Sequence, residues 1–172
     1  MTGRLIGLAM LIASAGAGAE VTDADAAGFG VLHERTVPLA PDAGYARFVG
    51  EAGQWWNGDH TWFGDAAALS IDGVAGGCFC ERSDGRSVEH MRVGTAVPGA
   101  LLRLLGGLGP LQPLGVSGAL SVEFAAAEAG TAITLTYRVS GYAAEGLAEW
   151  AGPVDYVLAE QLDRYVAHVG AD

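Results

Sequence analysis

The sequence contains no lysine, and its nine arginines are outnumbered by twenty acidic residues. The formal net charge of the 172-residue chain is therefore −11 at pH 7. A surface that binds the phosphate backbone of nucleic acids needs the opposite sign, so we expect no nucleic-acid partner. Solubility explains the excess of acidic groups, and the same excess disfavours binding to anionic lipid surfaces.

Cysteine is nearly absent as well, since Cys78 and Cys80 are the only two. No second cysteine pair is present to complete a structural zinc site, so we expect no metal and no other cofactor. The two residues are two positions apart on a predicted strand and therefore share a face. We interpret them as small apolar side chains packed on the sheet. A labile disulfide that serves redox exchange is the alternative.

The N-terminal segment has the order of a secretory signal peptide. Arg4 precedes an apolar segment, which is followed by small residues ending in Ala17-Gly18-Ala19. The apolar segment is shorter than the roughly 20 residues that span a bilayer, which favours cleavage over stable membrane insertion. We expect residues 1–19 to be removed and the protein to be exported, either to the periplasm or by secretion.

The remaining chain has the length of one domain. Residues 20–29 are small, acidic and unpatterned, and we expect a flexible lead-in before a domain over 30–170. Glycine, proline and aspartate divide this domain into a first strand, two short helices and a series of further strands. The predicted strands cover 30–39, 67–71, 77–82, 87–97, 101–105, 119–124 and 131–141.

A long helix closes the chain. Apolar residues recur at helical spacing over 147–169, and Pro153 should begin the main segment of this helix or kink it. Such an order of elements packs efficiently when the sheet curls round the helix. We predict an α+β fold in which a curved antiparallel sheet of about six to seven strands wraps round the terminal helix. The two short helices after the first strand then roof over a cavity.

Several stretches carry a resemblance to a known superfamily. They are Trp55-Trp56 after the second short helix, Gly76-Gly77-Cys78-Phe79 at the start of a strand, Pro98-Gly99 before Leu101, and Val154-Asp155 with 158–162 on the closing helix. Together with the order of elements, they resemble the START-like or SRPBCC superfamily, which has the helix-grip fold. The branch they resemble holds polyketide-cyclase-like proteins and homologues of the heat-shock ATPase activator. The resemblance covers nearly all of 30–169.

This resemblance implies a fold and a cavity but does not choose a reaction. Members of the superfamily include lipid carriers, hormone receptors, cyclases and chaperone regulators, so the site itself must decide the function. The predicted export signal argues against an ATPase-activating role, because the chaperone partner would be in another compartment.

A hairpin turn at Asp84-Gly85 predicts which side chains share a face. A two-residue turn places Glu81 opposite Val88 and Phe79 opposite His90. The inner face then holds Phe79, Glu81, Val88, His90 and Arg92, and the outer face holds Cys78, Cys80, Glu89, Met91 and Val93.

The inner face of this hairpin gathers groups that can carry chemistry. Glu81 and His90 become diagonal neighbours within reach of a hydrogen bond, and such a pair can move a proton on a bound ligand. Arg92 would hold an anionic group of that ligand. A buried polar network with a purely structural role is the alternative.

Aromatic residues gather before this hairpin. Four large aromatic residues and His60 lie within 55–63 and offer a wide, rigid surface to an apolar ligand. A small core that pins the short helices to the sheet is the alternative. The residues we predict to contact a ligand are Trp56, Trp62, Phe79, Glu81, His90, Arg92 and Tyr137.

Two further features are less specific. Residues 106–115 are apolar but broken by glycine and proline, so they form a mobile cover, a docking edge, or a rigid loop with buried leucines. His33 and His168 have no polar residue placed beside them by the sequence pattern.

We therefore expect an exported protein that binds a small hydrophobic or amphipathic ligand in an enclosed cavity. One alternative is an enzyme of the cyclase, dehydratase or isomerase type, with His90 as base and Glu81 orienting it. Another is a module that binds an unknown protein partner through 106–115. The sequence favours binding over catalysis.

Overall fold

A computed structural model describes residues 20–171, so the predicted signal segment lies outside the described residues. Eight antiparallel strands form one sheet in the order β1-β2-β8-β7-β6-β5-β4-β3. The strands are β1 (Glu20–Ala24), β2 (Gly28–Val37), β3 (Leu69–Ile71), β4 (Cys78–Ser83), β5 (Arg86–Val97), β6 (Leu101–Leu105), β7 (Ser117–Ala127) and β8 (Gly130–Ser140). The helices are α1 (Pro41–Gly50), α2 (Ala52–Trp55) and α3 (Ala148–Val169), with short 3-10 turns η1 (Gly58–His60), η2 (Ala66–Ala68) and η3 (Gly109–Leu114).

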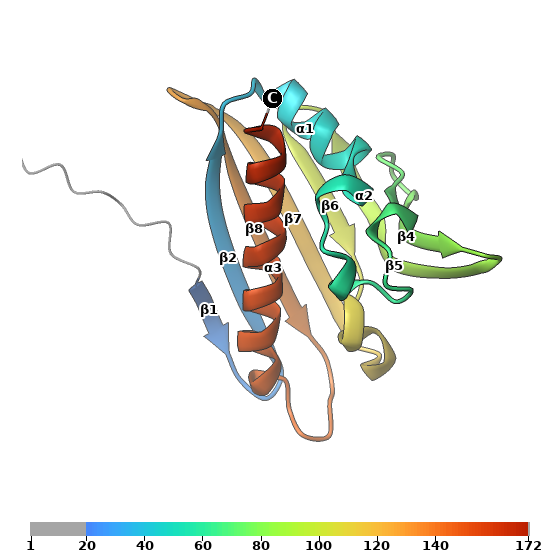
Figure 1. Cartoon of the computed structure of the whole chain (residues 1–172). Helices are drawn as coiled ribbons and strands as arrows, with labels where there is room; N and C mark the ends of the chain where they lie inside the picture. The colour runs from blue at the N-terminus through green and yellow to red at the C-terminus, as the bar shows by residue number, and fades with distance from the viewer. Residues whose placement is uncertain (1–19, 172) are drawn as a thin grey trace, which may run out of the picture.

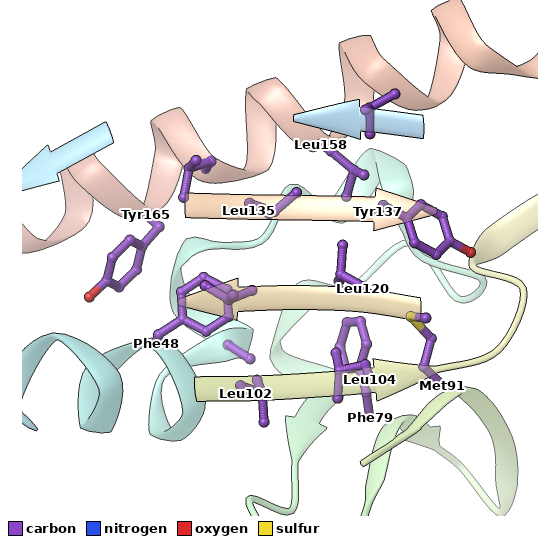
Figure 2. Packing of buried hydrophobic residues seen from close by; sticks show 14 of the residues in the cluster. Phe48, Phe79, Met91, Leu102, Leu104, Leu120, Leu135, Tyr137, Leu158 and Tyr165 are labelled. Carbon is purple, nitrogen blue, oxygen red and sulfur yellow. The ribbon is translucent and has the colours of Figure 1, made fainter. Parts of the chain in front are cut away.

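The long helix α3 runs along one face of the sheet and packs on β2 and β1 (Figure 1). The short helix α1 lies on the same face and contacts β7. The next helix, α2, packs against both α1 and α3. Apolar side chains from the strands and the helices meet between these layers in one core, part of which Figure 2 shows. The predicted α+β architecture, a sheet holding one long terminal helix, is confirmed. Pro153 lies in the second turn of α3, so the helix begins before it.

The lead-in expected at residues 20–29 has a regular structure instead. β1 pairs with β2, and this edge strand raises the number of strands to eight. Asp25 closes the turn between them, because its Oδ1 accepts hydrogen bonds from the amides of Ala27 (2.7 Å) and Gly28 (3.0 Å). All residues of β1 are exposed, so backbone pairing rather than apolar burial holds the strand in place.

The β4–β5 hairpin follows the predicted turn and then departs from the predicted register. Asp84 and Gly85 both have positive φ, as a two-residue turn requires, and Glu81 pairs with Val88. The register then shifts, because Cys80 pairs with Glu89 while its neighbour Phe79 pairs with Met91 rather than with His90. The intervening His90 is therefore the extra residue of a β-bulge.

This bulge changes which side chains face the core. His90 and Met91 are consecutive in sequence, yet both are buried, and Figure 2 shows Met91 among the core side chains with Phe79 and Leu104. The predictions that Met91 and Val93 face outward are both wrong for this reason, since Val93 is buried in the core as well. Arg92 turns to the outer surface instead, where it forms an ion pair with Glu89 and donates to the carbonyl of Gly76.

The two cysteines also differ from our interpretation. Cys78 and Cys80 are joined by a disulfide, with their Cα atoms 5.3 Å apart, rather than packing as free thiols. The disulfide spans a single residue, Phe79. This stretch of β4 lies directly opposite the bulge in β5.

His33 and His168 both have acidic neighbours that the sequence pattern did not indicate. His33 is fully buried on β2, and its Nε2 lies 3.1 Å from Asp155 Oδ1 on α3, although the two are not aligned for a hydrogen bond. His168 Nε2 donates to Glu51 Oε2 at 2.6 Å. Both contacts join α3 to segments more than a hundred residues earlier, which explains why sequence spacing missed them.

Gly118 on β7 leaves space for a tyrosine of the next strand. A Cβ atom at this position would lie 2.6 Å from Tyr137 Cε2 and 2.7 Å from the carbonyl oxygen of Gly106. We expect Gly118→Ala to lower the free energy of unfolding by about 1–3 kcal/mol, because the added carbon overpacks a buried contact. Urea unfolding followed by circular dichroism measures the change.

Gly152→Ala is the matched control, since no described atom lies within 4 Å of a Cβ at this α3 position. This variant should gain about 0.5–1 kcal/mol, because alanine restricts the unfolded chain and favours helix. Equal effects of the two variants would contradict the packing described for Gly118.

Candidate functional site

A cavity of about 450 Å³ lies between α3 and the β4–β5 part of the sheet. We call residues 56–63 the aromatic loop, and its members Trp56 and 59–62 form one wall of the cavity. Residues 108–110, at the start of η3, form another wall. The helix α3 contributes Trp150, Pro153, Val154, Val157 and Leu158, and the sheet contributes Leu69, Phe79 and His90. Most of this lining is apolar.

Glu81 holds the aromatic loop and a histidine of the cavity together. Its side chain is fully buried, and its two carboxylate oxygens accept hydrogen bonds from the backbone amides of Trp62 (2.8 Å) and Phe63 (2.7 Å). His90 Nε2 lies 3.1 Å from Glu81 Oε2 and donates the third hydrogen bond. A buried carboxylate needs such donors, so Glu81 fixes the position of the loop.

His90 presents its second ring nitrogen to the cavity. Burial lowers the pKa of His90 below its ordinary value, and the hydrogen bond to Glu81 and its charge act in the opposite direction. The neutral ring is therefore favoured at neutral pH. Since Nε2 donates to Glu81, Nδ1 carries the lone pair, and no hydrogen bond reaches Nδ1 from the residues the structure describes. His90 thus offers a hydrogen-bond acceptor to whatever fills the cavity.

The helix α3 anchors the other end of the aromatic loop. Glu160 accepts hydrogen bonds from Asn57 Nδ2 (2.5 Å) and His60 Nε2 (3.0 Å), and Gln161 Oε1 accepts from the backbone amide of Asn57 (2.7 Å). Sequence reasoning missed these contacts, because they join residues about one hundred positions apart and no local pattern marks them.

Four of the seven predicted ligand residues line the cavity. They are Trp56, Trp62, Phe79 and His90. Trp62 is 53% exposed and so lies where the cavity opens, whereas Phe79 is buried and its ring is 5.1 Å from that of His90.

The other three predicted residues do not line the cavity. Glu81 lies behind His90, and Arg92 is carried to the outer surface by the bulge. Tyr137 is fully buried, donates to the carbonyl of Gly106 and accepts from the amide of Leu108, both at 2.9 Å. It therefore positions the residues before η3 from inside the core.

The leucines of 106–115 face inward. Leu111 is fully buried, and Leu108 and Leu114 are half-buried against the core. The exposed large apolar side chains of residues 20–171 lie elsewhere, so the loop presents no leucine-rich docking edge. Among the alternatives, the loop has the arrangement with its leucines packed against the core, and Leu108, Gly109 and Pro110 line the cavity.

Within residues 20–171, no group of three or more histidine, cysteine, aspartate or glutamate side chains is placed to hold a metal ion. The same residues include no helix long and apolar enough to cross a membrane.

Burial of His90 predicts a pH-dependent stability. Folding lowers its pKa, so the unfolded chain binds the proton more readily and stability should fall as pH drops below about 6.5. His33 acts in the same direction, because burial lowers its pKa too. Urea unfolding at about pH 7.5 and about pH 5.5 should show a loss of stability for the wild type and a smaller loss for His90→Gln. An equal loss in the two proteins would contradict this account.

No protein-family model and no curated protein matches this chain, whereas solved structures do. The Aha1 dimer from Colwellia psychrerythraea has a TM-score of 0.55 and 16% identity, covering 81% of this chain and 95% of that chain. Ara h 8.0201 has a TM-score of 0.58 and 15% identity, covering 84% and 99%. A putative uncharacterized protein from Rhizobium leguminosarum has a TM-score of 0.57 and 19% identity, covering 88% and 100%. At these identities the similarity concerns the fold alone, and this chain has the helix-grip fold.

Proposed function

We propose that this protein binds a small hydrophobic or amphipathic ligand in the cavity between α3, the aromatic loop and the β4–β5 hairpin. The observation that carries this proposal is the cavity itself, whose volume of about 450 Å³ falls within the range of small-molecule sites. An apolar lining with few polar groups is the usual composition of such sites.

The side chains that line the cavity indicate which chemical groups the ligand carries. Trp56, Trp62 and Phe79 present ring surfaces to the cavity, which favour an apolar or ring-containing molecule. His90 Nδ1 is an acceptor, so a ligand with one hydroxyl or other donor group is matched at that wall. A ligand with these two properties is amphipathic.

We also propose that the protein is exported. The support is the order of charged, apolar and small residues in 1–19. The disulfide between Cys78 and Cys80 is consistent with an oxidising compartment.

Replacing a side chain at the cavity opening tests the binding proposal. Trp62→Ala should weaken binding of anilinonaphthalene sulfonate by about tenfold, because the ligand loses one of its aromatic contacts. Tyr142→Ala is the control, since Tyr142 is 85% exposed and does not line the cavity. Fluorescence titration measures both affinities, and a dye that binds neither the wild type nor the control would contradict an accessible apolar cavity.

A second candidate function is acid–base catalysis on the bound ligand. The hydrogen-bonded Glu81–His90 pair beside an apolar cavity is the observation that favours it. His90 would accept a proton through Nδ1, and Glu81 would stabilise the resulting imidazolium. Arg92 has no part in this scheme, since it lies on the outer surface.

Proton exchange detects this activity without knowledge of the natural substrate. A ketone bound in the cavity should incorporate deuterium from heavy water next to its carbonyl when His90 acts as a base. Mass spectrometry follows the incorporation, which should fall to the uncatalysed rate in His90→Gln. Incorporation at the uncatalysed rate with the wild-type protein would leave binding as the function of the cavity.

A further inference from the structure

The Cys78–Cys80 disulfide is a reactive group that the proposed binding function does not use. Its two cysteines place their side chains on the face of β4 that points away from the cavity, because Phe79 between them lines the cavity and side chains alternate along a strand. Cys80 is buried, whereas Cys78 is half-buried. A disulfide is cleaved by a thiolate that attacks one of its sulfur atoms, so Cys78 is the more accessible target.

The charges on this face agree with attack at Cys78. Arg92 on β5 pairs with Cys78 in the hairpin register, and Glu89 pairs with Cys80. Directly paired residues of antiparallel strands place their side chains on the same face. Although Arg92 and Glu89 form an ion pair with each other, a thiolate meets the cationic member of that pair beside Cys78 and the anionic member beside Cys80.

Phe79 connects the disulfide to the cavity. It is the single residue between the two cysteines, it is buried, and it lines the cavity. Its ring centroid lies 5.3 Å from that of Trp56 and 5.1 Å from that of His90, and both of these residues line the cavity as well. A displacement of β4 at Phe79 therefore moves a ring that packs against two other side chains of the cavity wall.

The disulfide holds β4 in a shortened form at this point. The Cα atoms of Cys78 and Cys80 are 5.3 Å apart, whereas residues two apart on an extended strand are separated by about 6.6 Å. Reduction removes the covalent constraint, so β4 can extend and shift Phe79 against the bulge at His90. A cavity whose wall is held less firmly binds its ligand more weakly, because binding must then order that wall.

We propose that the Cys78–Cys80 disulfide is a thiol–disulfide exchange site and that its oxidation state sets the affinity of the cavity. The co-reactant is a dithiol, which reduces the bond and weakens ligand binding. An external disulfide restores the bond and the affinity. This inference rests on the proposed binding function and adds its regulation.

The exchange proceeds in two steps. A thiolate of the dithiol attacks Cys78 Sγ and forms a mixed disulfide, while the bond to Cys80 breaks and the Cys80 sulfur leaves as a thiolate that takes a proton from water. The second thiolate of the dithiol then attacks its own partner sulfur in the mixed disulfide and releases Cys78, which is protonated in turn. The protein gains two electrons, and the dithiol is oxidised to a disulfide.

Reduction of the folded protein tests the proposal directly, because the chain contains no other cysteine. The oxidised protein and the protein treated with dithiothreitol at about pH 8, where thiolate is available, are titrated with anilinonaphthalene sulfonate. Alkylation followed by mass spectrometry counts the free thiols, and circular dichroism follows the fold. The reduced protein should stay folded and bind the dye about fivefold or more weakly than the oxidised protein.

Thermodynamic linkage supplies an independent measurement. If reduction weakens dye binding by a given factor, dye that saturates both forms must raise by the same factor the ratio of reduced to oxidised dithiothreitol at which half of the protein is reduced. The thiol count over a series of such ratios gives this midpoint. A midpoint that the dye leaves unchanged would contradict the coupling.

Serine variants separate the effect of the bond from that of the reductant. Cys78→Ser combined with Cys80→Ser cannot form the disulfide, so this double variant should bind the dye as the reduced wild type does and should not respond to dithiothreitol. Ser87→Ala is the control, because Ser87 is exposed on β5 of the same hairpin and does not line the cavity. It should keep the affinity of the wild type and its response to reduction.

The possible failures are distinguishable. Equal dye affinity of the oxidised and reduced wild type, loss of the fold on reduction, or a bond that dithiothreitol cleaves only in urea would each overturn the exchange site and leave the binding function standing. If the dye binds neither the oxidised nor the reduced protein, the proposed binding function fails and its regulation fails with it.

Discussion

The carboxylate of Glu81 is the constraint on which the site depends. It is fully buried and takes its three hydrogen bonds from two segments, the aromatic loop and β5. Leaving such a group without donors costs about 3–5 kcal/mol, more than most single contacts contribute. The loop amides and the His90 ring are therefore held where the carboxylate needs them. The cavity lies between this loop, the sheet and α3, so it depends on the hydrogen bonds that hold the loop in place.

The bulge in β5 and the disulfide in β4 are complementary features. Residues two apart on an extended strand are separated by about 6.6 Å, whereas the Cα atoms of Cys78 and Cys80 are 5.3 Å apart. The shortened stretch of β4 lies opposite the stretch of β5 that has one residue more. The extra residue is His90, and its insertion lets His90 face the cavity while Met91 still reaches the core. One local irregularity thus supplies both a polar group for the site and a side chain for the core.

The sequence predicted the parts of the molecule that are set by local rules. Alternating apolar residues in β8, the Asp84-Gly85 turn and the helical spacing of α3 are local signals, and the strands and the hairpin follow them. The predicted hydrogen bond between the side chains of Glu81 and His90 is present, because the Asp84-Gly85 turn fixes the register of the hairpin up to the bulge. The bulge could not be predicted, since no glycine or proline marks it. Met91, Arg92 and Val93 were misplaced for that reason alone.

Contacts between distant segments account for the rest of what sequence reasoning missed. Glu160 and Gln161 are consecutive residues of α3 that bind the same end of the aromatic loop, about one hundred residues away in the chain. On a helix surface such residues resemble solvated polar positions. The orientation of Gln161 follows from this anchoring, because the Asn57 amide donates to its oxygen and leaves its nitrogen without a partner among residues 20–171. The contacts that hold the loop over the cavity therefore also fix the orientation of the Gln161 carboxamide inside the protein.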